Sequence, residues 1–137
     1  MTTKKQFDDL TYLILGAAIE VHKAIGPGLL ESVYHKCMKH ELFLRQINFS
    51  SEQLVQIEYK GTAIESELRC DLVVEDKIAV EFKAVEAIAP IHEAKILTYM
   101  KLLKVPKGIL INFNCINIFK DGQRTYVNEL FQSLPER

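Results

Sequence analysis

The sequence predicts an α/β fold in which helices flank a mixed β-sheet, with elements in the order ααβββαββ. Two N-terminal segments place apolar residues at helical spacing, whereas the middle of the chain alternates polar and apolar residues as strands do. A third helical segment separates these strands from two short apolar ones. This order is typical of a sheet that is covered by helices.

Length and composition indicate one domain, residues 1–137. Apolar residues make up 48% of the 137 residues and charged residues 26%, an ordinary balance for one soluble core. No apolar run approaches the roughly 20 residues that cross a bilayer, so we expect no membrane contact. The polar N-terminus does not resemble a secretory signal, and Cys37, Cys70 and Cys115 do not have the density of a disulfide framework. We therefore expect a cytoplasmic protein with reduced thiols.

The two N-terminal helices are predicted at about Leu10–Ile25 and Leu30–Arg45. Gly26-Pro27-Gly28 ends the first helix, because proline cannot continue it and glycine permits the turn. The predicted strands are Gln53–Lys60, Ile64–Val74, Lys77–Phe82, Gly108–Asn112 and Ile116–Phe119. A third helix is predicted after Pro90, at about Ile91–Leu103. The side chains expected to face the core from this helix are Ile91, Ala94 and Leu97.

The second and third predicted strands form a hairpin whose register follows from its apolar residues. Alternate residues of each strand are apolar, and both apolar sets must face the core. The resulting pairs are Val74 with Ile78, Leu72 with Val80 and Cys70 with Phe82. The same register places Asp71 opposite Glu81 and Arg69 opposite Lys83, about 5 Å apart at Cβ. The connecting loop then has three residues, Glu75–Lys77.

Two carboxylates and a lysine therefore converge on one side of the predicted sheet. Like charges opposite one another are destabilising, and a divalent cation would offset them because Mg²⁺ prefers carboxylate oxygens. Lys83 would then orient a water or stabilise the transition state. The alternative is a solvated strand face, on which Arg69 and Lys83 offset Asp71 and Glu81 as a weak ion network.

Two motifs in the chain resemble a known family. Asp71, followed by Glu81-Phe82-Lys83, resembles the motif of the PD-(D/E)XK nuclease superfamily, with an acidic residue on one strand and E-x-K on the next. Upstream, the segment from Gly28 through Glu31 to Tyr34 matches the G-x-x-E-x-x-Y signature of the GxxExxY proteins, a group of that superfamily. The resemblance extends over nearly the whole chain.

The resemblance implies a restriction-endonuclease-like core and a nuclease that uses Mg²⁺ or Mn²⁺ to cut DNA or RNA. In that family pattern Asp71 and Glu81 would be metal ligands, and Lys83 would act on the water or the transition state. Glu31 would be an auxiliary ligand from the preceding helix, and the carbonyl of Phe82 a further ligand. Without the family, Glu31 is explained by the preference of helix N-termini for acidic residues.

The same resemblance implies contacts with substrate. Lys95 and Tyr99 share one face of the third helix, and related nucleases often carry Gln at the Lys95 position. Lys95 would either contact phosphate or pair with Glu81 and compete with the metal. Tyr34 is either a core aromatic or a hydroxyl near the phosphate, and Arg69 is a further candidate contact.

A metal-dependent nuclease is the leading hypothesis from the sequence. The alternative is a non-catalytic nucleic-acid-binding or protein-interaction module that keeps the nuclease fold. A net charge of -1 argues mildly against tight non-specific binding to nucleic acid, but it is compatible with a local basic groove. The chain has no P-loop and no G-x-S-x-G elbow. A homodimer is a further expectation, because two-fold dimers are the commonest oligomers.

Overall fold

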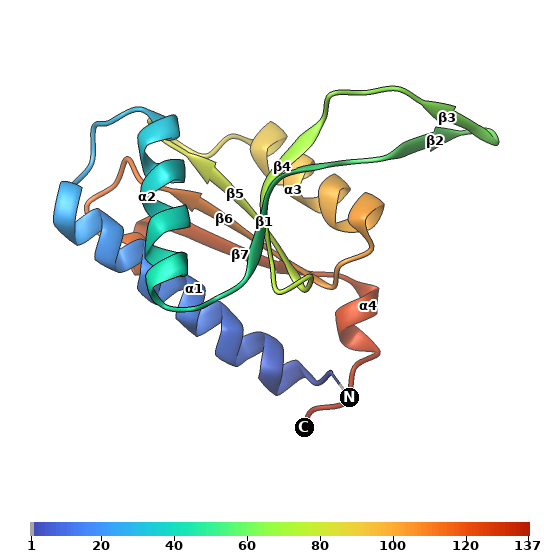
Figure 1. Cartoon of the computed structure of the whole chain (residues 1–137), viewed down its shortest axis with the longest axis horizontal. Coiled ribbons are helices and arrows are strands. Elements are labelled where there is room, and N and C mark those ends of the chain that lie inside the picture. Colours follow the sequence, from blue (N-terminus) through green and yellow to red (C-terminus); the bar gives the residue numbers. More distant parts are fainter. Residues whose placement is uncertain (1) are drawn as a thin grey trace.

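The computed structural model describes residues 2–137, in which helices pack on a five-stranded sheet and a two-stranded hairpin projects from it (Figure 1). The helices are α1 (Lys4–Ile25), α2 (Glu31–Leu44), α3 (Pro90–Leu103) and α4 (Glu129–Gln132), with a π-helical turn η1 (Ile118–Gly122). The strands are β1 (Phe49–Leu54), β2 (Ile57–Tyr59), β3 (Thr62–Ile64), β4 (Arg69–Val74), β5 (Ile78–Lys83), β6 (Lys107–Asn112) and β7 (Gln123–Val127).

The larger sheet has the strand order β1-β4-β5-β6-β7. β5 and β6 are parallel, and the other neighbouring strands are antiparallel. α3 makes the crossover from β5 to β6 and covers one face, while α1 and α2 cover the other (Figure 1). This mixed sheet between helical layers confirms the predicted fold class. No helix in residues 2–137 has both the length and the apolar character of a membrane-spanning segment.

Both faces of the central strands are buried. The strand residues on the α1–α2 side include Leu72, Val74, Ile78, Val80 and Phe82. The residues packed on the α3 side include Val73, Ala79, Ile96, Tyr99 and Met100. Every residue of β5 from Ile78 to Phe82 is buried, as expected for a strand covered on both sides. A charged residue such as Glu81 is therefore placed where packing alone would favour an apolar one.

Two of the predicted strands are each divided in the structure. The predicted strand Gln53–Lys60 contains the end of β1 and all of β2, and Ile64–Val74 contains the end of β3 and all of β4. The division occurs at Val55, which is 1% exposed and packs on the α3 side, with its N–H donating to the Leu68 carbonyl at 2.9 Å. Beyond that bond, β2 and β3 leave the sheet together as a separate hairpin.

The prediction of a strand at Ile116–Phe119 is wrong. η1 occupies part of this segment, and the strand β7 follows it. Ile116 is 92% and Phe119 63% exposed, so these apolar residues do not enter the sheet. The Asn117 side chain accepts a hydrogen bond from the Lys120 N–H at 2.9 Å and fixes the turn instead.

The face that α3 buries is also different from the prediction. Ile91 and Leu97 are 71% and 44% exposed, and Ala94 is exposed as well. The residues that face the sheet are Ile96, Tyr99 and Met100. Gly108 on β6 explains the choice, because a Cβ at this position would lie 2.6 Å from the Met100 Sδ. The missing side chain makes room for Met100, and this contact fixes the rotation of α3.

Tyr34 ties the loop between α1 and α2 to the core. Its side chain is 0% exposed and stacks on Phe113, with ring centroids 4.5 Å apart. Its hydroxyl donates to the Gly26 carbonyl at 2.6 Å and accepts from the Leu29 N–H at 3.1 Å. One side chain thus satisfies two backbone groups of a loop that has no regular structure of its own.

We expect Tyr34→Phe to lower the free energy of unfolding by about 1–2 kcal/mol, because it leaves two backbone groups without their partner. Urea denaturation measures the change. Tyr12→Phe is the matched control, since Tyr12 is 79% exposed and its substitution should be nearly neutral. Equal stability of the two variants would contradict this role for Tyr34.

Candidate metal centre

The hairpin that joins β4 to β5 sets the positions of the acidic residues. Its loop is Glu75–Lys77, three residues long as predicted, and Glu75 and Asp76 adopt positive φ angles of 53° and 56°. The backbone pairs are Val74–Ile78, Val73–Ala79 and Leu72–Val80. The predicted register is therefore confirmed up to Leu72, and it is fixed by the loop and the buried apolar faces.

Beyond Leu72 the two strands are joined by side chains instead of by the backbone ladder. Glu81 Oε1 accepts a hydrogen bond from the Asp71 N–H at 3.0 Å. Asp71 Oδ2 accepts one from the Phe82 N–H at 2.8 Å. Each carboxylate thus bonds to the backbone of the opposite strand, and the two acids are held beside each other.

The pairs predicted beyond this point, Cys70–Phe82 and Arg69–Lys83, are wrong, because the ladder ends at Leu72 and Val80. Cys70 also packs on the α3 side of the sheet, opposite to Leu72. Its thiol donates to the carbonyls of Leu72 at 3.3 Å and Val80 at 3.8 Å. The thiol bonds to carbonyls of both strands where the ladder ends. Burial, Glu81 and Asp71 all raise the pKa of this thiol, which is therefore unreactive.

Glu81 is a buried carboxylate, only 2% exposed. Burial raises its pKa and the Asp71 carboxylate raises it further, to about 7. The hydrogen bond from the Asp71 N–H and the charges of Lys95 and Lys83 act in the opposite direction without cancelling these effects. The site therefore carries negative charge that the groups of the protein compensate only in part.

Lys95 reaches this charge from α3. Its Nζ lies 3.7 Å from Glu81 Oε2 and 5.4 Å from the centre of the Tyr99 ring. Burial lowers the pKa of Lys95, but Glu81 and other nearby groups raise it by more, so the side chain is charged. Tyr99 is 2% exposed, and its ring is the aromatic surface that the Lys95 ammonium contacts. Burial also raises the pKa of the Tyr99 hydroxyl.

Glu31 begins α2 on the other side of the sheet and is half-buried. His35 follows it by one turn on the same helix face, and the His35 ring lies 5.4 Å from the Phe82 ring. Glu31 therefore lies one helical turn from His35, the α2 residue that contacts Phe82 on β5. In the described part of the chain, however, no three His, Cys, Asp or Glu side chains come together as a metal-binding group. Asp71 and Glu81 form a pair that Glu31 does not complete.

The side chains of Arg69 and Tyr34 form hydrogen bonds with groups other than the carboxylate pair. Arg69 is exposed at the start of β4, and its Nη1 donates to the Glu52 carbonyl at 3.3 Å. Tyr34 is buried, and its hydroxyl is already bonded to two backbone groups. The placement of Tyr34 favours the core role over contact with a phosphate.

Sequence reasoning missed Asn112, which supports the end of β5. Asn112 is 5% exposed and pairs with Lys83 across the parallel strands. Its Oδ1 accepts from the Val85 N–H at 3.0 Å, and its Nδ2 donates to the Val85 carbonyl at 2.9 Å. Asn112 therefore fixes the loop that follows Lys83. The signal in the sequence was a polar residue at the end of a continuously apolar strand.

The carboxylate pair has the chemistry of a site for a hard divalent cation. Asp71 and Glu81 each use one oxygen for a backbone hydrogen bond. Glu81 Oε2 faces only the long contact to Lys95, and no hydrogen bond within residues 2–137 reaches Asp71 Oδ1. Mg²⁺ is commonly held by one or two carboxylates, with waters and substrate phosphates as its other ligands. The donor set fits such an ion.

Comparison with known proteins gives one family match. A family model described as the PD-(D/E)XK nuclease superfamily matches residues 8–125. No significant match was found among curated proteins or among solved structures.

We expect Glu81→Gln to raise the free energy of unfolding of the metal-free protein above that of wild type, and to do so by more at pH 8 than at pH 5. The pKa of Glu81 in the folded protein, about 7, lies above its ordinary value of 4.5. The folded state therefore keeps a proton that the unfolded state releases, and stability falls as pH rises between these two values. Glutamine keeps the oxygen that accepts from Asp71 and never ionises. The gain at pH 8 should exceed that at pH 5 by on the order of 2 kcal/mol.

Urea denaturation in the presence of a chelator, at both pH values, measures this difference. Glu20→Gln on the exposed face of α1 is the control and should show no such pH dependence. A Glu81→Gln effect that is the same at both pH values would contradict a raised pKa of the Glu81 carboxyl.

Proposed function

The chain belongs to the PD-(D/E)XK nuclease superfamily, and from this premise we propose that it is a metal-dependent nuclease that hydrolyses nucleic-acid phosphodiester bonds. The observation that carries the proposal is the carboxylate pair of Asp71 and Glu81. Each has one oxygen fixed by the opposite strand and a second oxygen left for a ligand. The order of these residues, with Lys83 two positions after Glu81, is the order of the superfamily motif.

In this proposal Asp71 and Glu81 hold Mg²⁺ or Mn²⁺, with the Phe82 carbonyl as a further ligand. Glu31 does not join the pair directly, so its proposed auxiliary role is through a bridging water. A bound ion of this kind lowers the pKa of a water and neutralises charge on a phosphoryl oxygen. Lys83 orients the attacking water and stabilises the negative charge that develops on the phosphate. Lys83 suits this role because it follows Glu81 by two residues on β5 and so lies on the same face.

Lys95 and Arg69 are the proposed contacts with substrate phosphates. The Lys95 side chain is 40% exposed, and its contact with Glu81 is long, at 3.7 Å. Neutralisation of Glu81 by a metal would release the ammonium group to a phosphate, with Tyr99 keeping the lysine stem in place. Arg69 is exposed and its guanidinium offers the fork geometry that suits phosphate oxygens.

We also propose that the chain is a GxxExxY protein within the superfamily. The three residues that name the group lie in or contact the segment that joins α1 to α2. Gly28 has a positive φ of 93° in the loop between α1 and α2, and Tyr34 bonds to the same loop. Glu31 lies between them as the first residue of α2.

A non-catalytic module that binds nucleic acid or protein is the second candidate function. The ion pair between Lys95 and Glu81 favours it, because a cation of the protein already opposes one of the two proposed metal ligands. Under this function the protein would retain the fold and its surface without cutting a substrate.

We expect the wild-type protein to cut at least one member of a panel of single- and double-stranded DNA and RNA, only when Mg²⁺ or Mn²⁺ is present. Lys83→Ala should reduce the rate by about 100-fold or more, because it removes a charge that stabilises the transition state. Lys77→Ala, in the loop of the same hairpin, is the matched control and should retain activity.

Gel analysis of cleavage products over time provides the readout. Failure of the folded protein to cut any substrate with either ion, or equal rates for wild type and Lys83→Ala, would reject the nuclease and leave the non-catalytic module.

A further inference from the structure

The hairpin of β2 and β3 forms an arm, residues 56–67, that projects from the body of the protein (Figure 1). Its strands have three residues each, joined by a turn in which Lys60 and Gly61 have positive φ angles of 48° and 82°. An isolated two-stranded hairpin is at best marginally stable in water. The arm therefore has a structural reason to pack against another surface.

One face of the arm is apolar and open. Ile57 pairs with Ile64, and Tyr59 pairs with Thr62, so these four side chains share a face. Tyr59 is 62% and Ile64 43% exposed. The arm is also acidic, with Glu58, Glu65 and Glu67 against the single cation Lys60. This negative charge argues against contact between the arm and nucleic-acid phosphates.

A surface of opposite character lies on α3 of the same chain. Its outward face carries the apolar residues Ile91, Ala94 and Leu97, which are exposed. Lys101 and Lys104 are exposed at the end of this helix, and neither forms an ion pair within the residues that the structure describes. The other two charged residues of α3 are already paired, Glu93 with Arg124 and Lys95 with Glu81. The free charge of this face is therefore positive.

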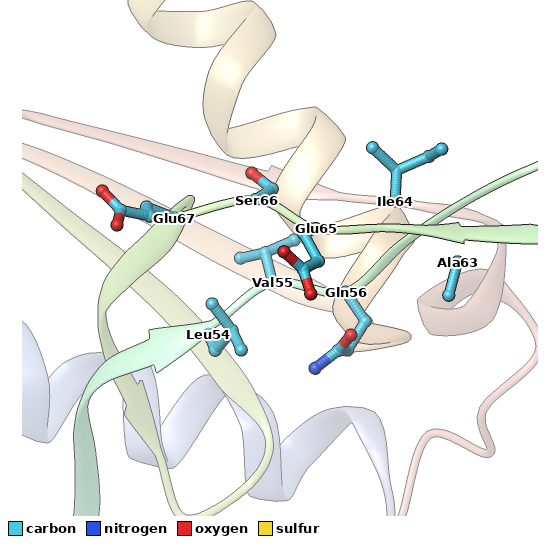
Figure 2. A pocket seen from close by; sticks show the side chains of 8 residues that line it. All are labelled: Leu54, Val55, Gln56, Ala63, Ile64, Glu65, Ser66 and Glu67. Atoms are coloured by element: carbon cyan, nitrogen blue, oxygen red, sulfur yellow. The ribbon is translucent and has the colours of Figure 1, made fainter.

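The root of the arm contains an open pocket of about 600 Å³, which is larger than a single side chain (Figure 2). Its lining includes the apolar residues Leu54, Val55 and Ile64 and the acidic residues Glu65 and Glu67. Lysine buries its methylene stem against apolar surface and keeps its ammonium at a polar rim. A partner's Lys101 or Lys104 would be complementary to this acidic pocket in charge.

We propose that two copies of this chain form a two-fold dimer in which the arm of each copy packs on the outward face of α3 of the other. The two surfaces are complementary in charge, and both carry exposed apolar side chains. A two-fold axis pairs each arm with the other helix, so both contacts form together. A standard interface takes about 800 Å² from each partner, roughly a tenth of the 8349 Å² surface of this chain. Each of the two contacts needs only about half of that area.

The test is sedimentation of the full chain over a concentration series, with charge reversals on the two surfaces. Wild type should sediment at twice the monomer mass of 15.7 kDa. The arm variant Glu65→Lys with Glu67→Lys, and the helix variant Lys101→Glu with Lys104→Glu, should each weaken self-association by about 100-fold or more, because like charges then face each other.

An equal mixture of the two variants should form dimers again. In a mixed dimer the reversed arm meets the reversed helix, and the native arm meets the native helix, so both contacts are attractive. This recovery cannot arise from misfolding of either variant. Leu97→Glu should also prevent dimerisation, whereas Leu44→Glu, at a residue that is 59% exposed on α2, should not.

A wild-type protein that stays monomeric throughout the series, or that dimerises only when nucleic acid is added, would overturn the proposal. A mixture of the two charge variants that remains monomeric would overturn it as well. Because no step depends on metal or cleavage, this outcome is independent of the nuclease test.

Discussion

The reciprocal hydrogen bonds between Asp71 and Glu81 are the constraint on which the site depends. Each carboxylate accepts from a backbone N–H of the opposite strand, at 3.0 Å and 2.8 Å. These bonds satisfy N–H groups that lost the regular ladder, so the two acids have a structural role in addition to the chemical one that we propose. The same bonds keep two negative charges close together, and burial of Glu81 makes that closeness unfavourable in the absence of a cation.

The rest of the fold supports this pair from several directions. The parallel alignment of β5 and β6 requires a crossover, and α3 provides it while carrying Lys95 to Glu81. Asn112 on β6 fixes the loop after Lys83. On the other face Tyr34 anchors the loop before α2, and α2 brings Glu31 within about one turn of the His35–Phe82 contact. The sheet therefore supports residues that come from distant parts of the chain.

Much of the fold followed from periodicity in the sequence, and so did the part of the hairpin register between Val74 and Leu72. Alternation cannot reveal that side chains replace the ladder beyond that point, which is why Cys70 was assigned to the wrong face. The buried face of α3 depends on Gly108, a residue of another element, and helix periodicity does not contain that information. Contact between Lys95 and Glu81 likewise depends on the crossing of α3 over the sheet.

Calorimetric titration of the metal-free protein with Mn²⁺ near pH 7, in two buffers with different ionisation enthalpies, tests the metal centre most directly. One binding event with release of protons is predicted, because the pKa of Glu81 is about 7 and the ion must displace its proton. Asp71→Asn should weaken binding about 100-fold or more, whereas Asp76→Asn, in the loop of the same hairpin, should not. Absence of binding by the folded wild type, or binding unchanged by Asp71→Asn, would contradict the proposed centre.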